Sequence, residues 1–333
     1  MGILAWRRSQ LTPLPRVEMS TTPISHPPSS ILAVVVVYNC ELSQSHSVSS
    51  LFQILNENPE LAKHFSVVLY DNSPQAQSPA APHGFPTHYV HDPSNGGLAT
   101  AYNFALARAE SEEREWLLLL DQDTSLTREF IAELLEAANT LHTQPEVAAI
   151  VPKLLVHGKV HSPAIPFTDQ MRRQFLPPTA ALTPDVVGVQ PQRLSAYNSG
   201  STLRVAALRS IGGFPAEFWL DFLDHAVFHA LIVNGYRVYV MLAMLAHDSS
   251  YSDIDSIPLW RLHNILMAQT LYMKRSGNFL DRLLFRIWLL RHSRNLRQSC
   301  KDPRVWKEAV LQALLFRVPT DPRPGFPSPL APE

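Results

Sequence analysis

Two aspartates separated by one residue, Asp121 and Asp123, directly follow an apolar run at 116–120. Side chains two positions apart in an extended chain point to the same side. The two carboxylates would therefore repel each other unless a cation lies between them. Mg²⁺ in proteins is held by one or two carboxylates together with substrate phosphates. The pair predicts a divalent metal site; the alternative is a strand end whose solvated acids cap a helix over 124–138.

Strand and helix patterns alternate along the first half of the chain and would position these acids. The predicted strands lie at 31–38, 65–70, 87–90 and 116–120, and the predicted helices at 43–57 and 98–109. Apolar runs of this kind are typical of parallel strands buried on both faces, and the alternation indicates right-handed crossovers. Ligands of such sheets bind beyond the carboxyl ends of the strands, where Asn39, Asp71 and Asp121 lie. The predicted fold class is α/β, with a Rossmann-like, mainly parallel sheet flanked by helices and a C-terminal helical region.

The composition limits the class of protein. With 46% hydrophobic and 17% charged residues, the 333-residue chain is globular rather than disordered or fibrous. Two cysteines, Cys40 and Cys300, make neither a disulfide framework nor a zinc ribbon and suit a reducing compartment. No run reaches the roughly 18 apolar residues that span a bilayer. We therefore predict a cytoplasmic protein, and the lack of a recognition module predicts no nucleic-acid partner.

Charge is distributed unevenly along the chain. Residues 256–317 contain 12 Lys and Arg against 3 Asp and Glu, a balance of +9, whereas the remainder contains 16 against 26, a balance of −10. This asymmetry predicts an acidic α/β domain at 31–255, followed by a basic helical region at 256–317. A flexible leader at 1–30 and a Pro-rich tail at 318–333 would flank them.

The basic region is also rich in apolar residues. The segment 279–317 begins with a stretch that is apolar nearly all round, in which Arg282 and Arg286 lie one turn apart. Phe285 and Trp288 would then sit at a headgroup boundary while the arginines reach phosphates. This pattern predicts peripheral contact with the inner face of a membrane. The alternative is a helix packed on the α/β domain with its arginines in solvent.

Seven short motifs stand in order along the chain, from about residue 31 to 275. They are Val35-Val36-Val37-Tyr38-Asn39, Asp71-Asn72-Ser73, Ser94-Asn95-Gly96-Gly97 with Asn103, Leu120-Asp121-Gln122-Asp123-Thr124, Asn198-Ser199-Gly200-Ser201, Gly212-Gly213-Phe214 and Leu220-Asp221-Phe222-Leu223-Asp224. Together they resemble an inverting glycosyltransferase of family 2 with the GT-A fold. The D-Q-D and N-S-G-S forms are most similar to the rhamnosyltransferase branch.

The resemblance implies a set of donor and metal ligands. Asp121 would lie beside the ribose and the metal, and Asp123 and His247 would ligate the metal, Mn²⁺ or Mg²⁺; an imidazole ligand favours Mn²⁺. The residues that would hold the nucleotide base and ribose are Val37, Tyr38, Asn39 and Asp71. The residues that would lie near the rest of the donor are Asn95, Gly96 and Gly97.

The resemblance also implies that Asp224 is the catalytic base. An inverting transfer needs one carboxylate to take the proton of the acceptor hydroxyl. Asp221, one turn earlier, is the competing candidate, and Asp224 could instead be an acid that favours a helix N-terminus. Where the family usually has another acid and an arginine beyond the base, this chain has Ala226 and Ala230. These two departures leave open whether the protein has full activity.

The implied activity is metal-dependent transfer of a sugar from a dTDP- or UDP-linked donor, such as dTDP-L-rhamnose, to a glycan or a lipid-linked acceptor. Such a reaction is typical of cell-surface polysaccharide biosynthesis. A nucleotidyltransferase would need a Gly-rich, basic loop after the first strand, but residues 39–50 contain no Gly, Lys or Arg. A dinucleotide-dependent oxidoreductase would need G-x-G-x-x-G after the first strand, and this motif is absent there. A non-catalytic scaffold that binds nucleotide sugars stays open.

Overall fold

The computed structural model describes residues 30–78, 84–175, 186–191, 193–246, 259–299 and 303–316. The predicted leader, apart from Ser30, and the predicted Pro-rich tail lie outside these residues. The predicted boundary between the α/β domain and the basic region also lies outside them, as does His247.

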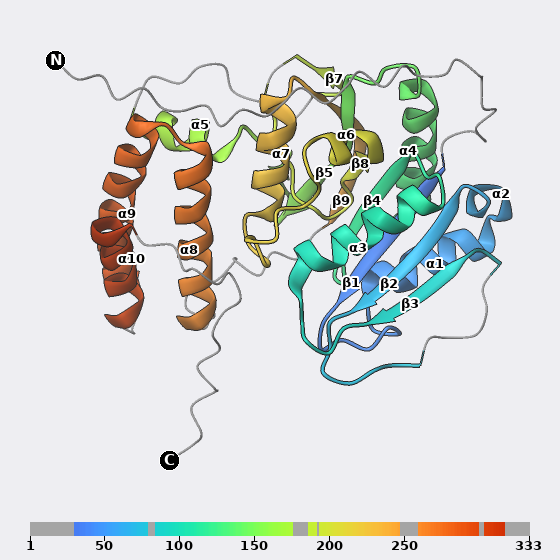
Figure 1. The fold of residues 1–333 in the computed structure, drawn as a ribbon, viewed down its shortest axis with the longest axis horizontal. Helices are drawn as coiled ribbons and strands as arrows, with labels where there is room; N and C mark the ends of the chain where they lie inside the picture. Colours follow the sequence, from blue (N-terminus) through green and yellow to red (C-terminus); the bar gives the residue numbers. More distant parts are fainter. Residues whose placement is uncertain are drawn as a thin grey trace, which may run out of the picture.

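A nine-stranded sheet forms the centre of the described part of the chain (Figure 1). Its strand order is β3-β2-β1-β4-β8-β5-β9-β7, and β6 pairs with β5 outside this path. The strands are β1 (Ile31–Val37), β2 (Phe65–Asp71), β3 (Thr87–His91), β4 (Trp116–Asp121), β5 (Val147–Val156), β6 (Lys159–Ser162), β7 (Gly188–Gln190), β8 (Thr202–Arg204) and β9 (Arg237–Ala246).

The helices flank this sheet and continue beyond it toward the C-terminus. They are α1 (His46–Glu57), α2 (Pro59–Ala62), α3 (Gly97–Ser111), α4 (Arg128–Leu141), α5 (Phe167–Arg173), α6 (Val205–Ser210), α7 (Leu223–Val233), α8 (Leu259–Ser276), α9 (Phe279–Ser299) and α10 (Pro303–Leu315). The predicted mixed α/β architecture with a C-terminal helical region is therefore confirmed.

The first half of the sheet is parallel, as its sequence predicts. β1 lies between β2 and β4 and is parallel to both, and every residue of β1 is buried. Its even-numbered residues pack with α3, and its odd-numbered residues pack with α1 and α4. The register pairs Val37 with Asp71 and Val36 with Asp121. The carboxyl ends of three strands thus meet at one edge of the sheet.

The second half of the sheet is mixed rather than parallel. β8 lies between β4 and β5 and is antiparallel to both, whereas β9 is parallel to β5. The sequence did not reveal this change of direction because β8 has only three residues and no long apolar run. Its position brings the segment just before it, 198–201, to the end of β4.

The acids after β4 do not cap the helix that follows. α4 begins at Arg128, four residues later than the sequence predicts, and the hydroxyl of Thr127 accepts its capping hydrogen bond from Phe130 N at 3.1 Å. Asp121 and Asp123 are therefore not helix caps, which removes the structural alternative for this pair.

An aromatic cluster joins the C-terminal helices to the α/β part. The ring of Phe167 on α5 lies 4.9 Å from that of Phe222, 6.0 Å from Tyr272 of α8 and 6.1 Å from Phe285 of α9, between ring centroids. Phe285 is fully buried and stacks on Trp288 at 5.8 Å. These two residues face the protein interior, so their predicted place at a headgroup boundary is wrong. Within the described residues, no helix is long and apolar enough to cross a membrane.

Candidate functional site

The carboxylate of Asp121 is held from two sides at the end of β4. Its Oδ1 accepts a hydrogen bond from the hydroxyl of Tyr102 at 3.2 Å, and its Oδ2 accepts one from the hydroxyl of Ser199 at 2.5 Å. Tyr102 lies on α3, and Ser199 lies in the segment before β8, where Gly200 N donates to Leu119 O at 2.9 Å. Asp121 is thus oriented by two segments that are far apart in sequence.

The charges of three carboxylates act on the hydroxyl of Tyr102. Complete burial raises the pKa of Tyr102 the most, and the charges of Asp121, Asp224 and Asp123 raise it further. The phenol therefore stays protonated and can donate to Asp121. The structure brings together the two acids of the predicted metal site and the predicted base.

Asp224 lies in the first turn of α7 and keeps part of its surface exposed. Its Oδ1 accepts a hydrogen bond from the N–H of His225 at 2.7 Å. Burial raises the pKa of Asp224, the charge of Asp121 adds to this effect, and His225 opposes it. A carboxylate whose pKa is raised toward the working pH is a more effective proton acceptor.

The competing candidate, Asp221, forms an ion pair with the C-terminal region. Arg261 of α8 lies 2.9 Å from Asp221 Oδ2, and the side chain of Asp221 is only 4% exposed. The next residue, Phe222, has a left-handed backbone with φ of 63°, which is rare and costly for a bulky side chain. The ion pair precedes this strained residue, so it helps to hold the turn that places Asp224.

The predicted donor loop is bonded to the same turn. Gly97 has a φ of +80°, and a Cβ there would lie 2.3 Å from both Trp219 Cδ1 and Trp219 O. The indole Nε1 of Trp219 donates to Asn95 O at 2.9 Å, and Leu98 N donates to Trp219 O at 2.8 Å. The space left by the missing side chain of Gly97 is thus filled by Trp219. This contact links the glycines to the turn before Asp224.

Asn103 fixes another motif from the same helix. Its Nδ2 donates to Phe214 O at 2.7 Å, and its Oδ1 accepts from Phe214 N at 2.9 Å. Gly213 lies against this side chain with a φ of +79°, and the two-glycine turn follows the end of α6. Asn103 and Gly213 therefore act in the architecture around the site.

Asp71, predicted to bind the nucleotide, is fully buried at the end of β2. Its Oδ1 accepts from Ser73 N at 2.9 Å, and its Oδ2 accepts from the hydroxyl of Tyr89 at 2.7 Å and from Gln77 Nε2 at 3.1 Å. Burial alone would raise the pKa of Asp71, but the hydrogen bonds from Ser73, Tyr89 and Gln77 together lower it. Asp71 is therefore a stable anion that orders the segment after β2.

The end of β1 is joined to the acidic triplet through its middle residue. The side-chain Oε1 of Gln122 accepts from Tyr38 N at 2.9 Å, and Asn39 N donates to the hydroxyl of Ser73 at 2.9 Å. Asn39 has a left-handed φ of 48°, and Tyr38 is 41% exposed. Gln122 thus sets the backbone at the predicted nucleotide position.

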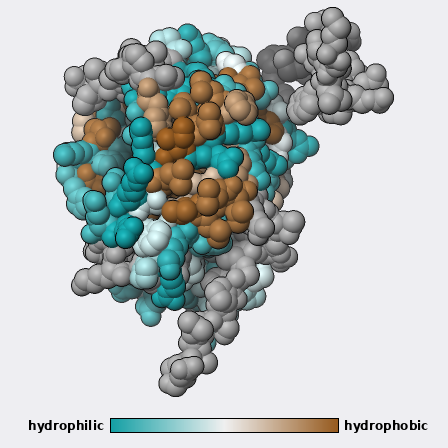
Figure 2. Space-filling model, turned by 90° about the vertical axis from the view of Figure 1, so that its left-hand side faces the viewer, coloured by the Kyte–Doolittle hydropathy of each residue, from teal (hydrophilic) through white to brown (hydrophobic). Residues whose placement is uncertain are grey.

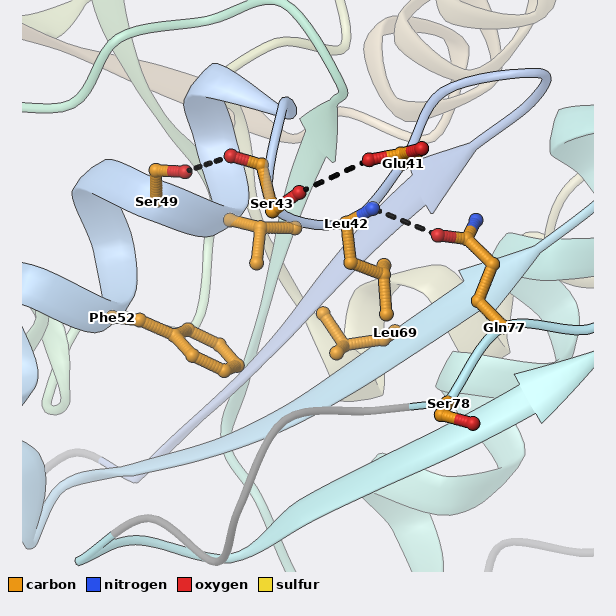
Figure 3. Close-up of a pocket in the computed structure, with 9 residues that line it drawn as sticks. Glu41, Leu42, Ser43, Ser49, Phe52, Leu69, Gln77 and Ser78 are labelled. Carbon is orange, nitrogen blue, oxygen red and sulfur yellow. Dashed lines mark hydrogen bonds between the residues drawn. The ribbon is translucent and has the colours of Figure 1, made fainter.

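A hollow of about 500 Å³ lies on the α1 side of β2 (Figure 3). Its lining combines apolar and polar side chains from the β1–α1 connection, α1, β2 and the segment after β2: Glu41, Leu42, Ser43, Val48, Ser49, Phe52, Leu69, Gln77 and Ser78. Gln77 closes it toward Asp71, because its Oε1 also accepts from Leu42 N at 2.8 Å. The hollow therefore borders the nucleotide position but contains none of the three clustered acids.

Asp121 and Asp123 are the described residues that could hold a metal ion, and the third predicted ligand, His247, lies outside the described residues. In the parts of the chain that the structure covers, no group of three or more His, Cys, Asp or Glu side chains is arranged to bind a metal. Two carboxylates suit a hard cation that takes its remaining ligands from water and phosphate. The donor set thus fits Mg²⁺ or Mn²⁺ shared with a diphosphate.

Several residues that shape the site were not predicted from the sequence. Tyr102, Trp219 and Arg261 contact the acids or their loops from elements distant in sequence. Only Ser199 carried a signal, since it lies in the N-S-G-S motif that the sequence had singled out, although its contact with Asp121 was not expected.

The comparisons with known proteins agree with this fold. Residues 32–178 match the family model of glycosyl transferase family 2. Asp224 lies beyond the matched residues. No sequence among the curated proteins matches the chain.

Two solved structures share the fold at low sequence identity. S. aureus TarS 1–349 in complex with UDP-GlcNAc is 15% identical, with a TM-score of 0.52 over 87% of this chain and 82% of that chain. GalNAc-T7 with UDP, GalNAc and Mn²⁺ is 11% identical, with a TM-score of 0.50 over 87% of this chain and 58% of that chain. Together with the family match, they establish a GT-A-like α/β fold.

The chain covers only part of a longer S. aureus TarS chain. The match to that chain has 16% identity and a TM-score of 0.47, over 79% of this chain and 43% of the TarS chain. The ligands named in the TarS and GalNAc-T7 structures belong to those proteins. What this chain shares with the two proteins is the fold.

Proposed function

We propose that the chain is a glycosyltransferase that uses a nucleotide-sugar donor and a divalent metal ion. The observation that carries this proposal is that Asp121 and Asp123 stand at the carboxyl end of β4, hydrogen-bonded through Asp121 to Tyr102, while Asp224 lies close enough for the charge of Asp121 to raise its pKa. The match of residues 32–178 to the glycosyl transferase family 2 model supports it. So do the UDP-GlcNAc and the UDP in the two structures of similar fold.

The acids at the end of β4 would hold the metal, with His247 as a further ligand. When bound, Mn²⁺ or Mg²⁺ neutralises the charge that develops on the leaving diphosphate. Asp121 is already oriented by Tyr102 and Ser199, so its geometry does not depend on the metal. Val37 to Asn39, together with Asp71, would contact the base and ribose, and the donor would extend toward Asn95 to Gly97.

Asp224 would act as the base of an inverting reaction. The acceptor oxygen attacks the anomeric carbon opposite the diphosphate, the carbon–oxygen bond to the diphosphate breaks, and the hydroxyl proton passes to Asp224. The raised pKa of Asp224 favours this proton transfer. The ion pair between Asp221 and Arg261 makes Asp221 a weaker candidate.

We also propose which classes of donor and acceptor the protein uses. The D-Q-D and N-S-G-S motifs favour a rhamnosyltransferase-like enzyme that uses dTDP-L-rhamnose, with UDP-linked sugars as the alternative. The acceptor would be a glycan or a lipid-linked acceptor, as in cell-surface polysaccharide biosynthesis.

The second candidate is a scaffold that binds nucleotide sugars without turnover. Ala226 and Ala230 favour it, because they replace the acid and the arginine usual in the resembled family. Turnover separates the two candidates, since a scaffold binds UDP or dTDP but releases no nucleotide diphosphate.

Calorimetry and a turnover assay together test the proposal. The full chain is titrated with UDP and dTDP, with and without Mn²⁺ or Mg²⁺, and then assayed for hydrolysis or transfer with a panel of UDP- and dTDP-sugars. We expect metal-dependent binding that Asp123→Asn weakens and Glu129→Gln, an exposed acid on α4, leaves unchanged. Binding without turnover of any donor supports the scaffold. The absence of binding contradicts both candidates.

A further inference from the structure

The outer face of α9 carries an exposed apolar stripe. Its inner face packs on the protein through buried residues that include Phe285 and Leu289. On the outer face, Phe279 is 83% exposed, and Leu283 and Ile287 follow it at intervals of four residues with exposures of 44% and 36%. Helical positions three or four residues apart lie on one face, so α9 is apolar on two sides: one is buried, and the other stays exposed among the described residues.

The same stripe becomes basic toward the end of α9. After Leu290, the next positions at intervals of four and three residues are Arg294 and Arg297, and both are exposed. Arg297 also lies over the Trp306 ring of α10 at 5.5 Å. One face of this helix therefore changes from apolar to cationic along its length.

α10 repeats this pattern in the opposite direction. Its exposed residues at intervals of four and three are Lys307, Leu311 and Leu314. Arg286 of α9 donates to Ala313 O at 2.6 Å and to Leu314 O at 2.8 Å, so the end of α10 lies against the first half of α9. The apolar ends of the two helices are therefore adjacent, and so are their basic ends.

Figure 2 faces the side of the molecule where α9 and α10 lie and shows apolar surface gathered there beside hydrophilic surface. The acids of both helices are engaged within the protein. Asp281 is 1% exposed and accepts from Arg172 Nη2 at 2.8 Å, and Glu308 lies 2.8 Å from His263 Nδ1. Within the described parts of α9 and α10, the outward faces thus combine apolar side chains with positive charge that neither Asp281 nor Glu308 offsets.

We propose that this face, formed by α9 and α10, docks on an anionic lipid surface. The apolar half enters the acyl boundary while Arg294, Arg297 and Lys307 contact the headgroups. The residues differ from those that the sequence suggested. Arg282 and Arg286 bind the carbonyls at the ends of α8 and α10, and the exposed apolar residues replace Phe285 and Trp288.

A second copy of this chain fits the face less well. In a twofold dimer each patch meets the same patch on its partner. The basic half of one copy would then face either the basic half of the other, which is repulsive, or its apolar half, which would strip water from the charges. Anionic lipid satisfies both halves at once.

Vesicle flotation with the full chain tests the proposal. We expect the protein to float with an equal mixture of phosphatidylcholine and phosphatidylglycerol, to float much less with phosphatidylcholine alone, and to dissociate as salt rises. Each cation near such a surface strengthens binding about fivefold, so Arg294→Gln combined with Lys307→Gln should weaken it about 25-fold. Phe279→Ser combined with Leu314→Ser should weaken it at least about tenfold.

Matched variants on the α/β part serve as controls. Val233→Ser and Leu242→Ser remove apolar side chains of comparable exposure, 69% and 65%, and Arg237→Gln removes an exposed arginine. These variants should bind vesicles as the unmodified chain does. Equal binding to neutral and anionic vesicles, no binding to either, or unchanged binding of the α9–α10 variants would overturn the proposal.

Light scattering of the same variants separates lipid from a second copy. If the unmodified chain is a dimer that Phe279→Ser converts to a monomer, the face is a dimer interface and the lipid proposal is wrong. Neither assay requires a sugar donor, so failure here is distinct from failure of the proposed glycosyltransferase activity.

Discussion

Asp71 and Asp224 lie in two regions of the molecule that hold a carboxylate in opposite ways. After β2, three side-chain or backbone groups donate to Asp71, and its pKa falls despite complete burial. At the start of α7, one backbone N–H donates to Asp224, Asp121 repels it, and its pKa rises. Burial therefore does not decide the role of an acid. The number of donors and the nearest charge decide whether it anchors the backbone or can accept a proton.

The largest expected effect separates the two acids by turnover. Asp224→Asn should lower kcat by at least about 100-fold, because a lost general base typically costs that much, while donor binding is kept. Steady-state kinetics and calorimetry with the same donor measure the two quantities. A variant with unchanged kcat would mean that Asp224 is not the base, and the comparison between the two acids would lose its functional half.

A second test concerns the contact that links the donor loop to the turn before Asp224. Gly97→Ala should lower the free energy of unfolding by about 3 kcal/mol, because its Cβ would overlap Trp219 at 2.3 Å. Gly235→Ala is the matched control, since Gly235 has nearly the same φ, +83°, with no atom within 4 Å of the new Cβ. Backbone strain alone should cost this control about 1 kcal/mol. Equal losses in urea denaturation would show that the contact with Trp219 contributes nothing.

Substitution should affect the free energy of unfolding more at Asp71 than at Asp224, the reverse of the order expected for turnover. Asp71→Asn should lower the free energy of unfolding by about 2 kcal/mol, because one of the two accepting oxygens becomes an NH₂ group, which cannot accept from the donors that face it. Asp224→Asn should leave the free energy unchanged or raise it, since the fold disfavours the ionised form of this residue. Urea denaturation of both variants at neutral pH measures this. Equal destabilisation would mean that the donors around Asp71 add no stability beyond burial.

The smallest expected effect is on the pH dependence of stability. The low pKa of Asp71 contributes stability that is present above the unfolded-state pKa, about 3.9, and is lost as pH falls through its folded value. The raised pKa of Asp224 has the opposite sign, so its penalty appears as pH rises from about 3.9 through its folded value. In mildly acidic solution, the free energy of unfolding of Asp224→Asn should therefore change less with pH than that of the unmodified chain. Profiles parallel to that of the unmodified chain would rule out a raised pKa.

Much of the fold could be predicted because its signals are local. The buried runs of β1 and β4 are contiguous in sequence, and they place Asp121 and Asp123 at the sheet edge without knowledge of any partner. The direction of β8 and the contacts of Tyr102 and Ser199 with Asp121 join segments about 20 to 80 residues apart. No periodicity records such pairings.

The sequence predicted an apolar helix over α9 but not which of its sides faces outward. A stretch that is apolar nearly all round shows that both sides of the helix avoid charge, but it does not say which side the protein covers. The aromatic cluster around Phe167 covers the side with Phe285 and Trp288. The side with Phe279 and Leu283 is left exposed.

The reach of α8 into the turn before Asp224 has a consequence for any shortened form of the protein. Arg261 and Arg275 of α8 form ion pairs with Asp221 and Glu217, and the first of these pairs is shielded from water. A fragment that stopped after β9 would retain the whole sheet but would leave Asp221 without the cation that pairs with it. Such a fragment could keep its nucleotide-facing strands in order and still lose the geometry at the start of α7.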